Sequence, residues 1–287
     1  MKVLELFSGI GGWRYAMEGI GEVVAAYDIS PAANATYTLN HGHAPLAKEL
    51  AHLPLEKLAA HGADTWALSP PCQPYCRMGK QQDLEDPRSR AFLHLLRALE
   101  AAPPGRLILE NVEGFEGSQA HLRLSELLRH LGMHERVLRL CPSEMGIPNL
   151  RPRLFLLAST RPIPDASLPA VAPCPLEPYL DVVEDEVLFL PEEVLAKHLP
   201  GLDLAAPEDR RSACFIGGYG RRLVGSGSFL RTSRGLRRFS PAEIALLMGL
   251  PAGFRFPEMV PLEKRYKLLG NGLSIPAARF AFSLLAG

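Results

Sequence analysis

The stretch TWALSPPCQP, residues 65–74, joins a short apolar segment to a turn with three prolines. The segment Thr65–Leu68 predicts a buried strand. This strand must end at Pro70, because proline lacks the N–H group that a sheet ladder needs. Cys72 follows at the expected carboxyl end of the strand, and ligands bind at that edge of open α/β sheets. Two interpretations of Cys72 are open here: a nucleophilic thiol, or a small buried structural cysteine.

Strand and helix patterns alternate through the first 160 residues. Strands are expected at 2–7, 22–27, 65–68, 106–109, 134–140 and 153–158. Helices are expected at 13–20, 30–39, 89–101 and 121–131. Repeated strand–helix units predict a parallel sheet with right-handed crossovers. We therefore expect an α/β fold with a Rossmann-like, doubly wound, mostly parallel sheet.

The composition changes after Ser159. The stretch 161–178 contains six prolines, which predicts an irregular connection into a smaller lobe. We expect the main domain at 1–160 plus 262–287 and the lobe at 161–261. Ser240 and Glu243 have the spacing of a capping box and predict a helix start. Residues 264–285 suggest a strand or loop followed by a helix.

The overall composition excludes several classes of protein. Of 287 residues, 47% are hydrophobic and 22% charged, as in soluble globular proteins. No apolar run approaches the roughly 20 residues of a membrane helix, and the amino terminus does not resemble a signal peptide. We therefore expect a cytoplasmic protein with no membrane partner. Five cysteines without CxxC spacing predict neither a disulfide framework nor a metal site.

Charges are segregated along the chain although the formal net charge is zero. Seven acidic residues lie in 177–193, and eight arginines without any acid lie in 210–238. A non-specific duplex binder is usually basic overall. The arginine segment could still bind a polyanion, and its aromatic residues could stack on bases. A solvated surface is the alternative.

A glycine-rich loop follows the first expected strand. Its residues are Phe7, Ser8, Gly9, Ile10, Gly11 and Gly12. Asp28 ends the second strand, where an acid commonly accepts hydrogen bonds from two ribose hydroxyls. The loop lacks the GxGxxG spacing, so a dinucleotide is not favoured, whereas S-adenosylmethionine carries adenosine without phosphate and fits a variant loop. A purely structural strand-to-helix turn is the alternative.

Three further motifs carry polar groups. Glu110 follows the strand 106–109 at the same expected edge as Cys72, where a partly buried carboxyl group could hold a proton. Arg151 and Arg153 flank a strand entry on one face and could bind a carbonyl or a phosphate. The alternative for Glu110 is an acid that only caps a helix or lies in a loop. The alternatives for the two arginines are a solvated edge or a salt bridge to Glu110. Residues 269–276 could return the chain to the cofactor pocket or form only a turn.

Taken in order, these motifs resemble those of the cytosine-5 methyltransferases. The family order is FxGxGG, PPCQP, ENV, NxRxR and GNGLS, found here at 7–12, 70–74, 110–112, 149–153 and 270–274. The resemblance covers 2–161 and 262–285. It implies the fold of a class I S-adenosylmethionine-dependent methyltransferase, with residues 161–261 as a target-recognition lobe.

The resemblance implies a role for each site residue. Cys72 would add to carbon 6 of cytosine, and Glu110 would bond ring nitrogen 3 and the exocyclic amine. Arg153 would contact the carbonyl oxygen of the base, and Arg151 would support the cysteine or a phosphate. The implied cofactor-binding residues are those of the 7–12 loop with Asp28, Leu50, Ser69 and Asn271. The implied substrate-binding residues are Gln73, Asn149, Phe215 and Tyr219.

Within that family the chain resembles the branch that methylates tRNA. The features are the long motif at 69–81, the lobe residues 214–220, the terminal motif 265–271, and Asn149 where DNA-acting relatives have glutamine. The implied substrate is tRNA, at the anticodon-loop cytosine of tRNA position 38. Three features depart from the family pattern: Ile216 replaces a threonine, Glu49 stands where DNA-acting relatives often have an aspartate, and the terminal motif reads Gly-Asn-Gly. Because the aspartate lies near the adenine in those relatives, the departure at Glu49 leaves the adenine contact placed only at Leu50.

Two other interpretations remain. A DNA cytosine-5 methyltransferase of restriction-modification type shares every catalytic motif, and DNA is therefore a possible alternative substrate. A nucleic-acid-binding module that has lost its activity is the other, although all five motifs are intact in this chain.

Overall fold

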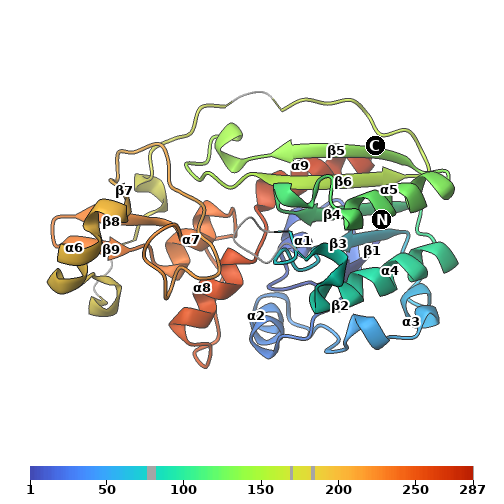
Figure 1. Cartoon of the computed structure of the whole chain (residues 1–287), viewed down its shortest axis with the longest axis horizontal. Helices are drawn as coiled ribbons and strands as arrows, with labels where there is room; N and C mark the ends of the chain where they lie inside the picture. Colours follow the sequence, from blue (N-terminus) through green and yellow to red (C-terminus); the bar gives the residue numbers. More distant parts are fainter. Residues whose placement is uncertain (76–81, 169–170, 182–184, 287) are drawn as a thin grey trace. The chain divides into compact units, whose positions relative to one another are not determined.

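The chain folds as two units, each with its own sheet, in the computed structural model (Figure 1). The first unit comprises Met1–Leu140, Pro152–Ser167 and Ala278–Gly287. The second comprises Cys141–Arg151 and Leu168–Ala277. The structure describes residues 1–75, 82–168, 171–181 and 185–286.

The first unit is built on a six-stranded sheet with the order β2-β1-β3-β4-β6-β5. Its strands are β1 (Lys2–Leu6), β2 (Glu22–Tyr27), β3 (Thr65–Leu68), β4 (Arg106–Asn111), β5 (His134–Leu140) and β6 (Arg153–Ser159). Neighbouring strands from β2 to β4 are parallel, whereas β6 runs antiparallel to β4 and β5. The predicted mostly parallel α/β sheet is confirmed. β6 is the exception, because residues 141–152 contain no α-helix to make a crossover.

Helices accompany this sheet, and all of them except α3 lie where the sequence predicts a helix. They are α1 (Gly12–Ala16), α2 (Pro31–His41), α3 (Leu55–Ala59), α4 (Arg90–Ala101), α5 (Gln119–His130) and most of α9 (Ile275–Ala286). The Ser30 hydroxyl caps α2 by accepting the N–H of Ala33 at 3.3 Å. α4 buries Phe92, Leu95 and Leu99 in the core, which is the apolar face that its helical spacing predicts.

Several elements differ from the predicted ones, most clearly β4, α1 and residues 264–270. β4 continues to Asn111 instead of ending at Leu109, because its last two residues still pair with β6. α1 ends at Ala16 instead of Ile20, and Gly19 beyond it has a left-handed φ of 77° that a helix cannot contain. Residues 264–270 are helical and not a strand or loop.

The second unit contains a three-stranded sheet of β7 (Asp203–Ala205), β8 (Ser228–Thr232) and β9 (Gly235–Arg238). Its helices are α6 (Glu192–His198), α7 (Pro241–Leu247) and α8 (Leu262–Gly270). The predicted capping box of α7 is confirmed, because Ser240 and Glu243 each accept the other's backbone N–H. The Glu243 carboxylate also forms a buried ion pair with Arg237 at 2.6 Å, which ties the start of α7 to β9.

The two units divide the chain differently from the predicted domains. Residues 141–151 and 262–277 belong to the second unit, whereas the prediction assigned them to the catalytic domain. The predicted domains were defined by their expected roles, whereas the two units are defined by compactness, so the division by role stays a prediction.

The last helical segment, Leu262–Ala286, has the length and the apolar composition of a membrane span, with 25 residues. A turn at 271–274 divides it into α8 and α9. Within its most apolar window, 56% is buried inside the protein. Core helices have the same composition, so the segment is weak evidence for a membrane.

Candidate active site

Four of the sequence motifs lie at one edge of the first unit's sheet. Leu6 at the end of β1 pairs with Tyr27 of β2 and with Leu68 of β3, and Leu68 pairs with Leu109 of β4. The chain that follows these four residues carries the 7–12 loop, Asp28, the turn with Cys72, and Glu110. The carboxyl ends of parallel strands share an edge, and the structure brings these motifs together there.

The turn that carries Cys72 is held by hydrogen bonds as well as by its prolines. The side-chain amide of Asn111 donates to the carbonyl of Pro70 at 3.2 Å. The N–H of Tyr75 donates to the carbonyl of Cys72 at 3.0 Å. Cys72 itself is half-buried. Sequence reasoning singled out Glu110 in the ENV motif and missed Asn111, whose signal was its place beside that acid.

Glu110 and Arg153 form an ion pair beside this turn. The guanidinium Nε of Arg153 lies 3.2 Å from a carboxylate oxygen of Glu110, and their side chains are 12% and 9% exposed. Glu110 lies near the end of β4, and Arg153 begins the neighbouring strand β6. The salt bridge considered as an alternative for the arginine is therefore present. A largely buried pair of this kind fixes the position of the carboxylate.

The glycine loop closes onto Asp28. One Asp28 carboxylate oxygen accepts the N–H of Gly9 at 2.8 Å, and the other accepts the N–H of Ser30 at 2.7 Å. Burial raises the pKa of Asp28 above its ordinary value, and these N–H groups oppose the rise. Gly11 has a φ of 84°, and a Cβ there would collide with the imidazole of His41. The backbone path of the loop therefore requires glycine at this position.

Two serines at this edge behave differently. The Ser69 hydroxyl accepts the indole N–H of Trp13 at 2.9 Å, which ties α1 to the start of the Cys72 turn. Ser8 is 5% exposed, and its hydroxyl has no hydrogen-bond partner among the described residues. A buried hydroxyl without a hydrogen bond lowers the stability of the folded protein. A polar ligand that hydrogen-bonds to Ser8 would remove this cost.

A buried acid behind the loop was missed by sequence reasoning. Glu5 lies inside β1 with no exposed surface, and the Tyr37 hydroxyl donates to it at 3.0 Å. Burial raises the pKa of Glu5 from 4.5 to about 8, against the effect of that hydrogen bond. The ring of Tyr37 packs on His41 at 4.6 Å, and burial lowers the pKa of His41 to about 4. The signal in the sequence was a charged residue inside an otherwise apolar strand.

The remaining predicted site residues of the first unit are Leu50 and Gln73. Leu50 begins a short 3-10 helix and is 4% exposed. Gln73 is half-buried directly after Cys72. Ile29 was not predicted, although it is 65% exposed beside Asp28 and offers an apolar surface next to the candidate ribose acid. Cys76 lies outside the described residues.

Arg151 belongs to the second unit, where it binds backbone carbonyls. It is 2% exposed, and its guanidinium donates to the carbonyls of Phe215 and Gly270 at 3.0 Å each and to that of Gly272. It also lies 3.4 Å from the sulfur of Cys214. Its donors thus hold two loops of the second unit together, and its predicted support of the cysteine or a phosphate stays a prediction.

Two predicted asparagines also lie in the second unit. Asn149 is 2% exposed, and its amide donates to the hydroxyl of Ser212 at 3.1 Å and to the carbonyl of Ala213 at 3.3 Å. Its predicted substrate contact is corrected to this internal bonding. Asn271 is exposed at the end of α8, and its cofactor contact stays a prediction.

Phe215 and Tyr219 lie in the core of the second unit. They are 3% and 0% exposed, and their rings pack edge to face with centroids 5.1 Å apart. The Tyr219 hydroxyl donates to the carbonyl of Ser228 at 2.6 Å and accepts the N–H of Phe239. Enclosed rings offer no face to a base, so their predicted base-stacking role is corrected to core packing.

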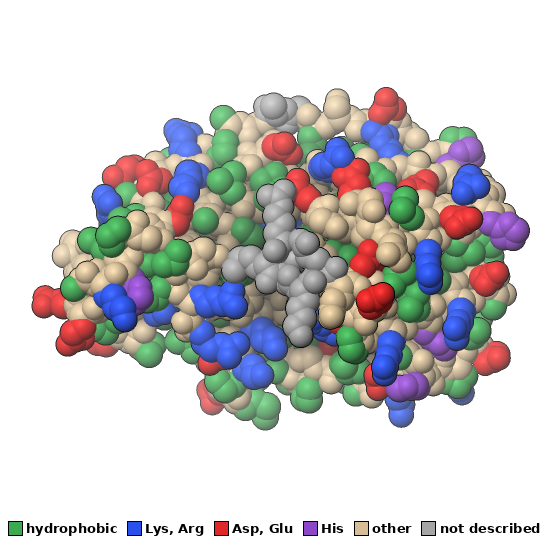
Figure 2. Space-filling model, viewed as in Figure 1, with side chains coloured by type: hydrophobic (Ala, Val, Ile, Leu, Met, Phe, Trp, Pro, Cys, Tyr) green, Lys and Arg blue, Asp and Glu red, His purple; other side chains and the backbone are tan. Residues whose placement is uncertain are grey.

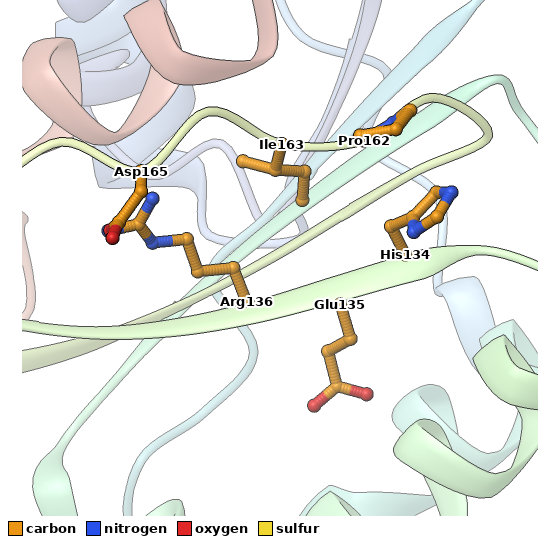
Figure 3. Close-up of a pocket in the computed structure, with 6 residues that line it drawn as sticks. All are labelled: His134, Glu135, Arg136, Pro162, Ile163 and Asp165. Carbon is orange, nitrogen blue, oxygen red and sulfur yellow. The ribbon is translucent and has the colours of Figure 1, made fainter.

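The first unit also contains a hollow, which Figure 3 shows in close-up. It is lined by His134, Glu135, Arg136, Pro162, Ile163 and Asp165. β5 begins there, since His134 pairs with Ser159, which in turn pairs with the first residue of β4. Arg136 reaches Asp165 at 2.6 Å. The hollow is therefore separate from the edge that carries Cys72.

Among the described residues, no group of three His, Cys, Asp or Glu side chains is arranged for a metal ion.

Comparisons with known proteins agree with this arrangement. The family model described as C-5 cytosine-specific DNA methylase matches residues 1–170. The tRNA (cytosine(38)-C(5))-methyltransferase of Schizosaccharomyces pombe is 32% identical, with 99% of this chain and 96% of that protein covered. The Homo sapiens protein of the same name is 30% identical, with 96% of each chain covered.

Two solved structures have the same fold. The S. pombe Dnmt2 methyltransferase matches with a TM-score of 0.90 at 32% identity, covering 99% of this chain and 98% of that one. The Entamoeba histolytica methyltransferase EhMeth matches with a TM-score of 0.93 at 27% identity and the same coverage. The family match spans the whole edge that carries the glycine loop, Cys72 and Glu110. This chain is a member of the C-5 cytosine-specific DNA methylase family.

Proposed function

We propose that this protein methylates carbon 5 of a cytosine in tRNA, at anticodon-loop position 38, with S-adenosyl-L-methionine as the methyl donor. The observation that carries the proposal is the single sheet edge that gathers Cys72, Glu110 and the glycine loop. Relatives that match nearly the whole chain have names that state this reaction.

The residues at the glycine loop fit such a cofactor. A Cβ at Gly9 would meet no described atom within 4 Å, so a ligand can approach the backbone there. The Ser8 hydroxyl is buried without a partner among the described residues. Asp28 keeps acceptor capacity after its two backbone bonds, since a carboxylate has about four lone-pair sites, and ribose hydroxyls can use it. Ile29 would cover the adenine, and Leu50, Ser69 and Asn271 remain proposed contacts.

When bound, the cofactor supplies an electrophilic methyl group, and the side chains of the sheet edge prepare the base. The Cys72 thiolate adds to carbon 6 of cytosine, which makes carbon 5 nucleophilic. Glu110 bonds nitrogen 3 and the exocyclic amine, so the charge that develops on the ring is stabilised. Arg153 holds that carboxylate through the 3.2 Å ion pair. Loss of the carbon 5 proton and release of Cys72 restore the enzyme.

Cationic side chains of the second unit support RNA as the partner. Six arginines of the 210–238 segment are exposed: Arg210, Arg211, Arg221, Arg222, Arg231 and Arg234. Three of them form surface ion pairs with acids, which contribute little to stability and leave the cations available to phosphate. Figure 2 shows Lys and Arg side chains gathered over α8, where Lys264 and Lys267 are also exposed. The anticodon loop offers a cytosine that is already partly unstacked.

We assign catalysis to residues 1–160 plus 262–287 and target recognition to 161–261, and we place the protein in the cytoplasm, where cysteine thiols stay reduced. The charge pattern supports this division, because six of the eight arginines in 210–238 are exposed and no acidic residue interrupts them.

Bisulfite sequencing of total tRNA after incubation with the pure protein and S-adenosylmethionine tests the proposal. We expect one new protected cytosine, at position 38 of one or a few tRNAs. Parallel reactions with radiolabelled cofactor use total tRNA and duplex DNA at equal nucleotide concentration. Label in DNA alone would reject tRNA as the substrate and favour a DNA methyltransferase, a name that a Dictyostelium discoideum relative at 26% identity carries.

A further inference from the structure

We infer that Asp83 is a positioning residue that holds the Cys72 turn in place through the start of α5. The inference rests on the proposed function, since it concerns the nucleophile of that reaction. Asp83 has no part in the cytosine chemistry itself. It acts through the backbone on which Cys72 is carried.

The Asp83 side chain binds the first residues of a long helix. One carboxylate oxygen accepts the N–H of Gln119 at 2.6 Å, and the other accepts the N–H of Ala120 at 3.2 Å. These residues begin α5, which has 12 residues. The first N–H groups of a helix have no partner within the helix and favour an anionic acceptor. Asp83 is therefore anchored to α5 although 36 residues separate it from Gln119.

The Asp83 backbone connects that anchor to the Cys72 turn. Its N–H donates to the carbonyl of Pro74 at 3.4 Å, and the N–H of Tyr75 donates to the carbonyl of Cys72 at 3.0 Å. The carbonyl of Asp83 in turn accepts the hydroxyl of Ser89 at 2.6 Å, next to the start of α4. Two hydrogen bonds thus lead from the nucleophile's own turn to a residue that is fixed to two helices.

The other end of the turn is fixed by β4. Asn111 binds the carbonyl of Pro70, and a Cβ at Gly114 would collide with the carbonyl of Tyr75. The Tyr75 ring packs on Phe115 with centroids 5.0 Å apart. Asn111 therefore fixes the turn before Cys72, and the contacts of Tyr75 together with the Asp83 hydrogen bond fix it after Cys72.

The backbone conformation of Asp83 points the same way. Its φ is 50°, in the left-handed region that few residues other than glycine, asparagine and aspartate enter. Among the described non-glycine residues only Phe7 shares this feature, and Phe7 belongs to the proposed cofactor loop. Unfavourable backbone conformations concentrate at functional sites where the surroundings hold them.

Three variants separate positioning from helix stability. Asp83→Ala removes the carboxylate. Asp83→Asn keeps an acceptor oxygen and a residue that tolerates positive φ. Ser118→Ala is the matched control, because the Ser118 hydroxyl caps the same helix at the N–H of His121 without contacting the turn. The measurements are the single-turnover rate of methyl transfer to tRNA, the Kd for S-adenosylmethionine, the thermal midpoint, and the rate of Cys72 alkylation by iodoacetamide.

We expect Asp83→Ala to slow single turnover about ten- to hundredfold, as small displacements of a reacting group do. The Kd for the cofactor should stay within about twofold, and Asp83→Asn should recover most of the rate. Ser118→Ala should lower the thermal midpoint and leave the rate unchanged. A wild-type rate in Asp83→Ala, or equal slowing in Ser118→Ala, overturns the inference.

Two further measurements keep the inference testable. If Asp83→Ala does not fold, Gln119→Pro removes the 2.6 Å bond to Asp83 at the one helical position that accepts proline, and a normal single-turnover rate there overturns the inference. If the wild type methylates no tRNA, the proposed function fails. Cys72 alkylation then decides the inference: a rate altered in Asp83→Ala but not in Ser118→Ala supports it, and unaltered rates overturn it.

Discussion

Arg151 and Arg153 are two residues apart, yet they serve different parts of the molecule. Arg153 begins β6 in the first unit and pairs with the carboxylate of Glu110 at 3.2 Å. Arg151 is buried in the second unit, where it donates to the carbonyls of Phe215, Gly270 and Gly272. Arg153 orients a carboxylate at the edge that carries Cys72, and Arg151 supplies hydrogen-bond donors to backbone carbonyl groups. The comparison teaches that the partner of a buried charge decides what the charge does.

The same contrast separates the two regions that these arginines represent. The sheet edge of the first unit gathers side chains with chemical capacity, among them Cys72, Glu110 and Asp28. The cluster around Arg151 consists of backbone carbonyl groups. Gly270 is required in this carbonyl cluster because a Cβ would collide with the backbone of Gly217. Variants of the edge should therefore change activity more than stability, and variants of the carbonyl cluster should do the opposite.

The largest expected effect is at Cys72. Cys72→Ala should abolish methyl transfer, a loss of at least about 10⁴-fold, because carbon 5 is no longer activated. Thermal stability and S-adenosylmethionine binding should remain near wild type, since the proposed cofactor contacts do not include Cys72. Cys76→Ala is the control and should keep substantial activity. Trapping on RNA that contains 5-azacytidine measures the thiol directly, and an adduct in the Cys72 variant would refute the assignment.

Glu110→Gln should have the next largest effect. The amide cannot hold the proton or balance the charge on the base, so single turnover should fall on the order of 10²- to 10³-fold. The variant also leaves the largely buried Arg153 without its carboxylate, so we expect a loss of about 1–3 kcal/mol in the free energy of unfolding. Quenched-flow transfer assays and urea denaturation measure the two effects. Activity within tenfold of wild type would place the base-binding acid elsewhere.

Arg151→Lys and Arg153→Lys compare the two arginines directly. One ammonium group cannot reach three carbonyls, so Arg151→Lys should lower the free energy of unfolding by about 2–4 kcal/mol. Hydrogen exchange should then rise at residues 214–217 and 270–272. Arg153→Lys keeps a cation beside Glu110, so its unfolding free energy should change by less than about 1 kcal/mol while turnover slows roughly tenfold. The reverse ranking in urea denaturation would contradict the structural role of Arg151.

The smallest effect is a pH dependence that arises from Glu5. Burial raises the pKa of its carboxyl in the folded protein from 4.5 to about 8, so the folded state binds more protons than the unfolded state between these values. The contribution of Glu5 to stability is therefore complete below pH 4.5 and is lost as pH rises through 8. Glu5→Gln should flatten the stability profile in that interval. Equal slopes for wild type and variant in urea titrations from pH 5 to 9 would show that Glu5 is ionised in the folded protein.

Several parts of the fold follow from short sequence patterns. The segments 22–27 and 65–68 are strands at the predicted residues, because mainly apolar runs bounded by turn residues have few alternatives. The segment 134–140 is also a strand at the predicted residues, although four of its seven residues are polar or charged. The caps at Ser30 and Ser240 follow from local hydrogen bonding. The edge with Cys72 and Glu110 follows from strand ends, since the carboxyl ends of parallel strands must meet.

Other features depended on contacts between distant segments. Nothing near Asp83 in the sequence indicates that its carboxylate binds the start of α5 at Gln119. The basic spacing of 151 and 153 predicted one shared face, but β6 begins only at Arg153. The aromatic residues of the lobe looked like candidates for base stacking, and their burial was decided by Phe239 and Tyr266 from later segments.

The sequence by itself determined the family and the order of the motifs, and it predicted Cys72 as the nucleophile and Glu110 as its acid, because each depends on residue types at fixed local spacing. The tertiary structure decided which charged side chains lie at the candidate active site and which hold segments of the fold together. Burial, partner and distance set that choice for Arg151, Arg153, Glu5 and Asp83. These quantities depend on residues far apart in the chain, and no local pattern contains them.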